Sequence, residues 1–392
     1  MGEGFENIML AQSKALRETA SNIRRELHKV PELGFELEKT RQLVKHYLKA
    51  FGVRKIEDCG DGILALIEAE DPNGPVIGLR ADMDAMPGEE ATGLHFSSQH
   101  KGRMHSCGHD GHMANLLITA KLLMENLEKW RGQVKLIFQP AEESVSGAKQ
   151  MIKNGALEDP KVDKIFGLHI WQPLETGTIG IKSGPLMAST DNFKIELTGR
   201  AAHAATPHQG IDAISAGCDF VNKVQTILTR VIPNKERYVL TFGKINGGDA
   251  FNAVAETVTL EGVFRSFNNE IRKKGNEQIQ LNLEAISKTY GVRWCYEVMN
   301  EASPLINHNQ MTEVVKNAAS KVISPTDIKE IDPVTPAEDF AEYLNAIPGA
   351  YFFLGGGGEG YTYSHHHSKF DFNEEALTIG PAIFTQIVLE LT

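Results

Sequence analysis

Four groups of Cys, His and Glu side chains carry residue types that could do chemistry. The densest group is the run HSCGHDGH at residues 105–112, in a loop that we expect to lead into the N-terminus of a helix. Thiolate and imidazole are preferred ligands of zinc and similar metals. Cys107 and His109 are separated by one glycine, so in an extended stretch both side chains would face one point. The run predicts a metal site, and the alternative is a polar loop that happens to be rich in His.

Adjacent carboxylates at Glu142 and Glu143 form the second group. They follow a buried strand that we expect over residues 133–139, and ligands bind at the strand ends of α/β sheets. One carboxylate would bind a metal while the other moves a proton. The alternative is a solvated helix start, because Glu is favoured near a helix N-terminus.

Two histidine segments complete the set. His169 lies in the apolar, strand-like run FGLHIW at residues 166–171, where a lone His is more often a hydrogen-bonded core residue than a ligand. The run HHH at residues 365–367 follows a glycine loop, and its internal position argues against a purification tag. Each of the four groups follows a predicted strand in the same α/β half of the chain, and this coincidence favours one metal centre.

Other polar residues offer supporting roles. Asp82 and Asp84 follow a predicted strand and would be ligands, or carboxylates that orient a metal-bound His. His203, Asn252 and Arg265 stand further along the chain, and an Arg can hold a carboxylate through two parallel hydrogen bonds. On spacing alone these three are typical of a loop His, a turn Asn and an edge-strand Arg.

The composition indicates a globular protein with two domains. The chain has 392 residues, of which 41% are hydrophobic and 23% charged, and this length exceeds what a single core usually serves. The formal net charge of -11 argues against nucleic acid as a partner, because a phosphate backbone needs a basic footprint.

Targeting signals are not expected. No run approaches the length of about 18 apolar residues that a membrane span needs. The first residues lack a basic segment followed by an apolar one, and Glu6 stands where a myristoylation site needs Ser or Thr. The four cysteines are widely spaced, as is typical of reduced thiols. Together these features predict a cytoplasmic protein without membrane contact.

Helices and strands are expected to alternate around the candidate site. Hydrophobic periodicity predicts helices over residues 8–29, 38–51, 111–129, 310–321, 337–345 and 374–390. Short β-rich runs predict strands over residues 63–68, 76–80, 133–139 and 350–354. This alternation predicts an α/β sheet with helices on its faces.

The middle of the chain has a different order of expected helices and strands. Its expected order is β-α-β-β-α-β, with elements over residues 192–199, 212–230, 238–245, 254–267, 269–290 and 292–299. This is the order of the ferredoxin-like unit. We therefore expect an inserted α+β domain at residues 187–299 and a first domain formed by residues 1–186 and 300–392.

Taken together, these motifs resemble the aminoacylase and carboxypeptidase family of two-metal amidohydrolases. The likeness covers nearly the whole chain and is greatest to the branch of hippurate hydrolases, N-acyl-L-amino acid amidohydrolases and plant auxin-conjugate hydrolases. It is carried by RELH (25–28), PELG (31–34), RADMDAMP (80–87), CGHDGH (107–112), QPAEE (139–143), GLH (167–169), GRAAH (199–203), EDF (338–340), and His366 before FDF (370–372).

The resemblance implies a fold and a set of roles. The first domain would be a zinc-peptidase-like catalytic domain with a mixed sheet, and the insert would be a lid that also forms a homodimer or dimer-based homo-oligomer. Two divalent ions (Zn, Mn, Co or Ni) would be held by Cys107, His109, Glu143, His169 and His366. Glu142 would be the general base. His203 would help to hold the oxyanion, and Asn252 and Arg265 would bind the substrate's α-carboxylate.

Two departures from the family pattern affect this assignment. The broader family has a ligating His where Asp82 stands, so Asp82 and Asp84 are expected outside the ligand set. Ser368 stands where Pro is common, and His366 is preferred as the ligand because of its spacing to Phe370. The expected reaction is hydrolysis of the amide bond of N-acyl-L-amino acids. The alternatives are a dipeptidase or carboxypeptidase of the same mechanism, and a non-catalytic binding protein that keeps the metal site.

Overall fold

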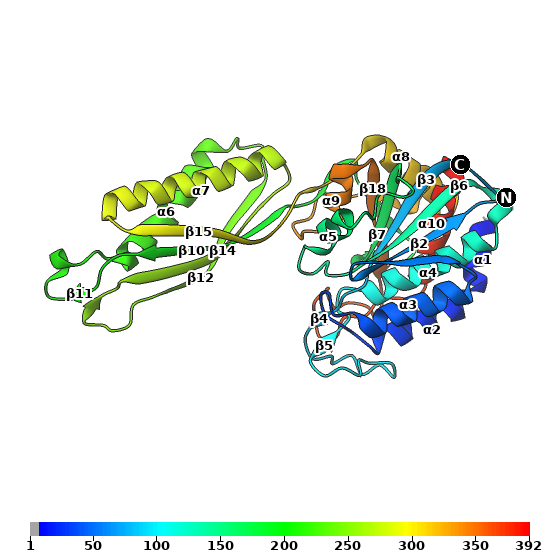
Figure 1. Ribbon diagram of the computed structural model, residues 1–392, viewed down its shortest axis with the longest axis horizontal. Coiled ribbons are helices and arrows are strands. Elements are labelled where there is room, and N and C mark those ends of the chain that lie inside the picture. The colour runs from blue at the N-terminus through cyan, green and yellow to red at the C-terminus, as the bar shows by residue number, and fades with distance from the viewer. Residues whose placement is uncertain (1–7) are drawn as a thin grey trace. The chain divides into compact units, whose positions relative to one another are not determined.

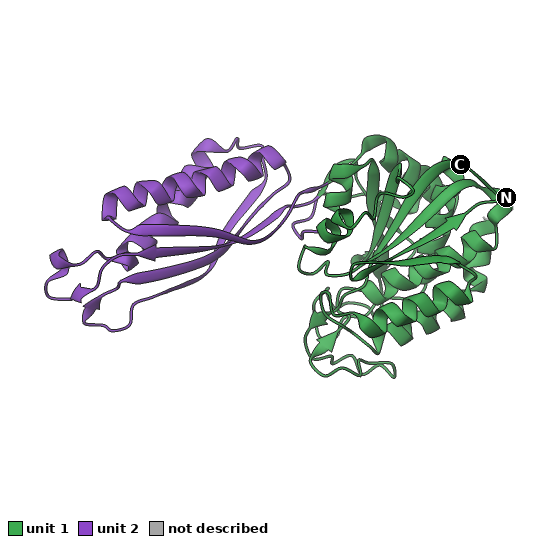
Figure 2. Cartoon of the chain, in the orientation of Figure 1, with its two compact units in different colours: residues 1–186, 306–332, 339–392 green, residues 187–305, 333–338 purple. Residues whose placement is uncertain are grey.

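The computed structural model describes residues 8–392 and divides them into two compact units (Figure 2). Unit 1 comprises Met1–Leu186, Ile306–Asp332 and Asp339–Thr392, and unit 2 comprises Met187–Leu305 and Pro333–Glu338. The expected return to the first domain at residue 300 falls inside a strand of unit 2, which runs to Ala302. The segment 333–338, expected in the first domain, also belongs to unit 2.

Unit 1 is organised around a mixed sheet (Figure 1). Within the described residues this sheet has eight strands. Its strands are β1 (Lys55–Cys59), β2 (Gly62–Glu68), β3 (Asp71–Asp82), β6 (Arg131–Gln139), β7 (Lys164–Glu175), β8 (Ile179–Ile181), β17 (Ile328–Glu330) and β18 (Gly349–Gly357). Their order is β1-β2-β6-β3-β7-β18-β8-β17. The four central strands, β6, β3, β7 and β18, run parallel, so their carboxyl ends meet at one edge of the sheet.

Helices cover the faces of this sheet. They are α1 (Ile8–Ala15), α2 (Arg17–His28), α3 (Glu38–Ala50), α4 (His109–Met124), α5 (Gly147–Lys153), α8 (Asn309–Ser320), α9 (Ala341–Ala346) and α10 (Ala376–Leu391). Helix α4 packs on the sheet, and α2, α3 and α10 pack against α4. Along β3, the side chains of Ile77 and Leu79 belong to the apolar core. Because side chains alternate between the two faces of a strand, Arg80 and Asp82 point to the opposite face at the end of β3. Buried polar residues therefore reach the edge where the central strands end.

Unit 2 is the ferredoxin-like domain that the sequence predicts. Its main elements are β10 (Thr190–Thr198), α6 (Ala213–Val231), β12 (Tyr238–Gly247), β14 (Thr257–Ser266), α7 (Asn269–Tyr290) and β15 (Arg293–Ala302). The sheet is antiparallel, in the order β12-β14-β10-β15. Apolar residues of α6 and α7 pack on the sheet around Phe193 and Phe264 and form a second core. This unit thus has a core of its own.

Short strands form small two-stranded sheets in the connections. They are β4 (Met86–Pro87) with β5 (Arg103–Met104), β9 (Gly184–Met187) with β16 (Leu305–Asn307), and β11 (Ala202–His203) with β13 (Ala253–Val254). The sequence did not predict β4, β5, β9, β11 or β16, because two to four residues are too few to show a period.

Two expectations about the N-terminal region and targeting can be compared with the structure. The helix expected over residues 8–29 is broken at Leu16, which separates α1 from α2. Within residues 8–392, no helix is both long and apolar enough to span a membrane. The expectation that the chain opens without a targeting signal concerns in part residues 1–7, which lie outside the described residues, and the cytoplasmic location stays a prediction.

Candidate metal centre

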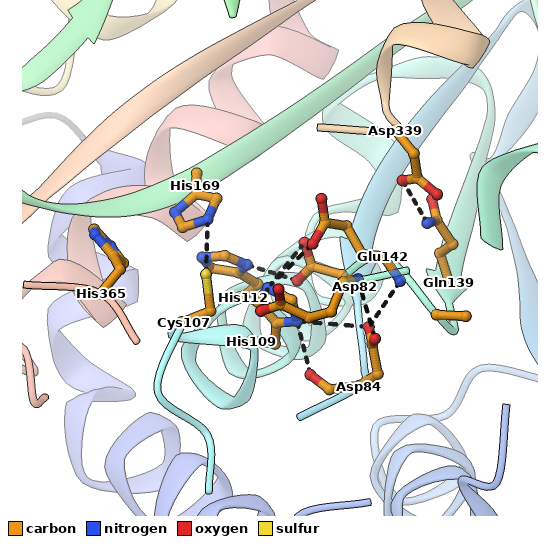
Figure 3. A network of polar contacts seen from close by, with 12 residues as sticks. Asp82, Asp84, Cys107, His109, His112, Gln139, Glu142, His169, Asp339 and His365 are labelled. Atoms are coloured by element: carbon orange, nitrogen blue, oxygen red, sulfur yellow. Dashed lines mark hydrogen bonds and ion pairs between the residues drawn. The ribbon is translucent and has the colours of Figure 1, made fainter. Parts of the chain in front are cut away.

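The candidate residues of unit 1 meet at the edge where the parallel strands end. Asp82 closes β3, Glu142 and Glu143 follow β6, His169 lies within β7, and the loop that contains His366 follows β18. Cys107 comes just before α4, whose first residue is His109. The expectation that all four groups follow strands is wrong for His169, which is inside β7. The Cys107 run follows the short strand β5, which lies outside the large sheet, and leads into α4. Figure 3 shows the Cys107 sulfur turned towards His169, with His109 and Glu142 nearby.

The backbone around Cys107 differs from the extended stretch that we expected. Gly108 has φ +91°, a left-handed conformation that suits glycine, and helix α4 begins at the next residue. A sharp turn, rather than alternation along a strand, therefore brings Cys107 and His109 to the same side. The alternative of a polar loop that happens to be rich in His is disfavoured, because residues 105–112 are all buried and residues 109–112 belong to α4.

Cys107, His109 and His169 form one group of possible ligands, whose donor atoms all lie within 4.8 Å of one another. The Cys107 Sγ and His169 Nε2 atoms are 3.5 Å apart. His169 Nδ1 donates to the Ile170 carbonyl at 2.8 Å, and His109 Nδ1 donates to the Asp84 carbonyl at 2.7 Å. Since a carbonyl only accepts, both rings carry their proton on Nδ1 and keep Nε2 for another partner.

A second group of possible ligands, whose donor atoms also all lie within 4.8 Å of one another, consists of Cys107, Glu143 and His366. His366 Nε2 lies 3.6 Å from Glu143 Oε1. The His366 backbone has φ +67°, and its N–H donates to the Ser106 carbonyl at 2.8 Å, which ties this loop to the segment before Cys107. Because Cys107 belongs to both groups, its sulfur stands where one thiolate could serve two ions.

Unpartnered buried atoms support metal binding. Among the described residues, His109 Nε2 and Glu143 Oε1 are buried and have no hydrogen-bond partner. Such atoms are costly unless something else occupies them, and an ion would satisfy both. The donor set of one thiolate, three imidazoles and one carboxylate also suits a mixed-ligand divalent metal. The residues present therefore fit a metal centre.

Glu142 lies beside these groups, and its carboxylate forms a further group of possible ligands with His109 and Glu143. Its side chain is buried, and its Oε2 lies 3.9 Å from His109 Nε2. The alternative of a solvated helix start is wrong, because Glu142 follows Ala141, which has φ +54°, in a tight turn before α5. Asp84 holds this turn by accepting from the backbone N–H groups of Glu142 at 2.9 Å and Glu143 at 3.2 Å.

His112 supports the site without a nitrogen left for a metal. Its Nδ1 donates to Asp82 Oδ1 at 2.6 Å, and its Nε2 accepts from the Ile170 N–H at 2.8 Å. The other oxygen of Asp82 accepts from Arg80 at 2.7 Å. Asp82 therefore orients His112, which is not one of the proposed ligands, although Asp82, His109 and His112 also form a group of possible ligands.

A buried polar network behind Asp82 was not found by the sequence reasoning. Arg80 also donates to Gln139 at 2.9 Å and to Asp339 at 3.1 Å. Gln139 donates to Asp339 at 2.7 Å (Figure 3). The one signal in the sequence is the alternation of Arg80 and Asp82 on one strand, which places them on the same face. The partner Asp339 lies 259 positions away and could not be found from local pattern.

Crowded carboxylates shift the pKa values of the ligand candidates. Burial, with the charges of Glu143, Glu142 and Asp82, raises the pKa of the Cys107 thiol well above its ordinary value. Burial alone would lower the pKa of His109, but Asp82, Asp84 and Glu143 raise it to about 10. The site therefore attracts positive charge, and a bound cation would reverse the protonation of both groups.

The three remaining candidates belong to unit 2. His203, which is exposed, lies in β11 opposite Ala253 of β13, and the Ala204 N–H donates to the Asn252 carbonyl at 3.0 Å. This ribbon places His203 and Asn252 close together. Arg265 lies in β14, is half-buried, and donates to the Thr335 carbonyl at 2.9 Å. It is not an edge-strand residue, because β14 lies between β12 and β10.

Comparison with known proteins adds independent information. Residues 78–390 match the model of peptidase family M20/M25/M40. The chain is 40% identical over 358 residues to the N-acetyl-L-cysteine deacetylase of Bacillus subtilis (strain 168), which covers 91% of this chain and 84% of that protein. It is 36% identical over 365 residues to thermostable carboxypeptidase 1 of Saccharolobus solfataricus, which covers 91% of each chain.

A solved structure agrees with these sequence matches. The crystal structure of a dinuclear metal-binding peptidase of the M20 family from Bacillus subtilis has a TM-score of 0.83 and 32% identity, covering 96% of this chain and 98% of that chain. The fold and the clustered donors define a metal-binding hydrolase of amide bonds. The chain belongs to peptidase family M20/M25/M40. The predicted family, fold class and enzymatic nature are confirmed, and the alternative of a non-catalytic binding protein is not supported.

Proposed function

We propose that this protein hydrolyses the amide bond of N-acyl-L-amino acids, so that the substrate and one water give a carboxylic acid and a free amino acid. The observation that carries the proposal is the position of Glu142 beside two donor groups that share Cys107. Such a site would combine bound ions, which would activate water, with a base that can move the water's proton. Relatives named as deacetylases of N-acetylated amino acids support this choice of substrate.

Two divalent ions are proposed for the centre. Cys107 would hold both, with His109 and His169 on one and Glu143 and His366 on the other, in accord with the two groups of possible ligands that contain Cys107. When bound, the ions would lower the pKa of a water and polarise the scissile carbonyl. Zn, Mn, Co and Ni remain equal candidates, because mixed sulfur, nitrogen and oxygen donors suit each of them.

Glu142 is proposed as the residue that moves the proton. It would accept a proton from the attacking water and then deliver it to the nitrogen of the departing amino acid, so that the proton count balances. The buried turn held by Asp84 fixes the Glu142 backbone, which keeps the carboxylate in place for both transfers.

Unit 2 is proposed to recognise the rest of the substrate. Arg265 and Asn252 would bind the free α-carboxylate, and His203 would stabilise the negative charge on the carbonyl oxygen. The role of unit 2 as a lid and as the interface of a homodimer is part of the same proposal. The dimer is tested by light scattering, where the mass of a single chain, 43.2 kDa, would contradict it.

A carboxypeptidase or dipeptidase is the second candidate function. It is favoured by the 36% identity to thermostable carboxypeptidase 1, and the same metal centre and Glu142 would serve it. The two candidates differ only in the group on the acyl side of the scissile bond.

The proposal is tested by measuring amino-acid release from a panel of substrates. The panel contains hippurate, N-acetyl-Met, N-acetyl-Cys, N-acetyl-diaminopimelate, indole-acetyl amino acids and dipeptides. Each is assayed after chelation and after Zn or Mn is added back. Metal-restored release from acylated amino acids is expected, while release from dipeptides alone would favour the second candidate. No release from any member would contradict the proposed substrate class.

A further inference from the structure

His365 is the residue next to the proposed ligand His366, and its ring is held on several sides. It stacks on Trp171 with ring centroids 4.8 Å apart and an angle of 29° between the planes, and it contacts Phe370 at 5.0 Å. Trp171 is itself stacked on buried Phe353 at 4.2 Å and 11°. His365 is therefore fixed to strands β7 and β18 through aromatic contacts.

A shared hydrogen-bond acceptor links His365 to the other ligand group. His365 Nε2 donates to the Ile170 carbonyl at 2.9 Å, and the same carbonyl accepts from His169 Nδ1 at 2.8 Å. Figure 3 shows His365 beside His169, and their ring centroids are 5.2 Å apart. One peptide oxygen thus orients His169 and holds His365 as well.

His366 needs such support because its own conformation is unfavourable. Its φ of +67° lies in the left-handed region, which costs a non-glycine residue on the order of 1 kcal/mol. Its side chain is 50% exposed, so burial does little to fix it. The backbone bond to Ser106 holds one side of the residue, and His365 precedes it directly.

The third histidine of the run has a different environment. His367 is exposed, its ring stacks on Tyr363 at 4.6 Å, and its Nδ1 accepts from the Lys369 N–H at 3.0 Å. It offers a matched control, because it has the same side chain and also adjoins His366.

We propose that His365 is a positioning residue, which fixes the backbone at His366 so that the His366 ring faces Glu143 and Cys107. This inference rests on the proposed metal centre. Within the triple His, one residue would bind an ion, one would position it, and the third would do neither. His365 is not itself a ligand in this proposal, since its Nε2 donates to the Ile170 carbonyl and none of the possible ligand groups found within residues 8–392 contains it.

The experiment counts ions rather than turnover. The full-length wild type and the variants His365→Ala, His365→Phe and His367→Ala are loaded with Zn and dialysed against graded chelator. Bound Zn per chain is then measured by mass spectrometry, and thermal unfolding of each metal-free chain is recorded to check folding. His365→Phe keeps an aromatic ring against Trp171 but has no nitrogen to ligate a metal.

The proposal predicts a graded result. His365→Ala should lower the affinity for the ion held by Glu143 and His366 by about tenfold or more, as expected when a residue that orients a ligand is lost. The affinity for the other ion should stay unchanged, because His169 keeps its own bond to the Ile170 carbonyl. His365→Phe should recover most of this loss, and His367→Ala should match the wild type. Equal losses in the Ala and Phe variants would overturn positioning through the aromatic contacts with Trp171 and Phe370. Wild-type retention in His365→Ala would also overturn it.

The same data separate this inference from the proposed function. A wild type that retains no ions would overturn the metal centre and with it the role of His365. A wild type that retains two ions yet cleaves nothing in the substrate panel would contradict only the proposed substrates, because the ion count does not depend on turnover.

Discussion

The carboxylate of Asp84 accepts a hydrogen bond from the backbone N–H of Glu142 at 2.9 Å. A side chain two residues beyond β3 thereby holds the turn that follows the neighbouring strand β6, 58 positions away. The same Asp84 accepts from Glu143 through its other oxygen, and its carbonyl orients His109. The proposed base and two proposed ligands therefore depend on one aspartate that binds no ion in our assignment.

The first prediction concerns Glu142. The variant Glu142→Gln should lower kcat by about 10²- to 10⁴-fold, because an amide cannot accept the proton of the attacking water. It should keep both ions, since Glu142 is not among the proposed ligands. Steady-state kinetics and metal analysis of the same sample measure the two effects. Loss of an ion together with activity would show instead that Glu142 is a ligand.

The second prediction concerns the pH dependence of metal binding. The pKa of His109 is raised to about 10 and that of Cys107 lies well above its ordinary value, so both groups hold a proton at pH 7 without an ion. An ion must displace both protons, so its apparent affinity should increase with pH by about one log unit per pH unit for each proton. Calorimetry in buffers of different ionisation enthalpy counts the released protons. Binding without proton release would contradict these pKa shifts.

The third prediction concerns stability and His28. This buried residue bonds Asp110 at 2.8 Å and Glu90 at 3.3 Å. Burial and nearby Arg24 lower its pKa, but the two carboxylates outweigh them and raise it to about 9. A raised pKa gives stability that is fully present below the unfolded value near 6.5 and is lost as the pH rises through 9.

The variant His28→Gln should therefore lower the free energy of unfolding most near pH 6, by roughly 2–3 kcal/mol, and progressively less towards pH 10. Urea unfolding at several pH values measures this difference in the free energy of unfolding. His46→Gln on the exposed face of α3 is the control and should cost little at any pH. A cost for His28→Gln that grows with pH would have the wrong sign.

The fourth prediction concerns Arg265 and the substrate carboxylate. Arg265→Ala should raise KM by about 10- to 100-fold, since a charge-assisted hydrogen bond contributes about 1.5–3 kcal/mol. Esterifying the substrate should produce a similar loss with the wild type but little further loss with the variant, because both changes remove one interaction. Exposed Arg293→Ala is the control. Additive losses would show that Arg265 does not contact the carboxylate.

The fifth prediction concerns the buried network around Arg80. Replacing Arg80 by Met would leave Asp82 and Asp339 buried without the guanidinium that pairs with both, which should destabilise the protein by about 3–5 kcal/mol. The exposed pair of Arg131 and Asp71 is the comparison, and Arg131→Met should cost less than about 1 kcal/mol. Denaturant unfolding measures both variants. A similarly small loss of unfolding free energy in both variants would mean that the buried ion pairs of Arg80 do not stabilise the protein.

Much of the architecture was predictable because it depends on local pattern. The ferredoxin-like order in unit 2 follows from period-two strands and two amphipathic helices, such as α6 and α7, which each bury one face. The strands that end near Asp82 and Glu142 are apolar runs bounded by turns. The break at Leu16 and the shortest strands were missed, because so few residues contain no measurable period.

The sequence by itself determined which residue types were available for chemistry and in what order, from Cys107 and His109 to Glu142, Glu143, His169 and the triple His. Only the tertiary structure decided which of those side chains keep an atom for a metal and which are held by other protein groups. His112 is occupied by Asp82 and the Ile170 N–H, while His109 has a free Nε2 because its Nδ1 meets the Asp84 carbonyl. Each choice depends on a hydrogen bond between segments far apart in the chain, and such bonds leave no local pattern in the sequence.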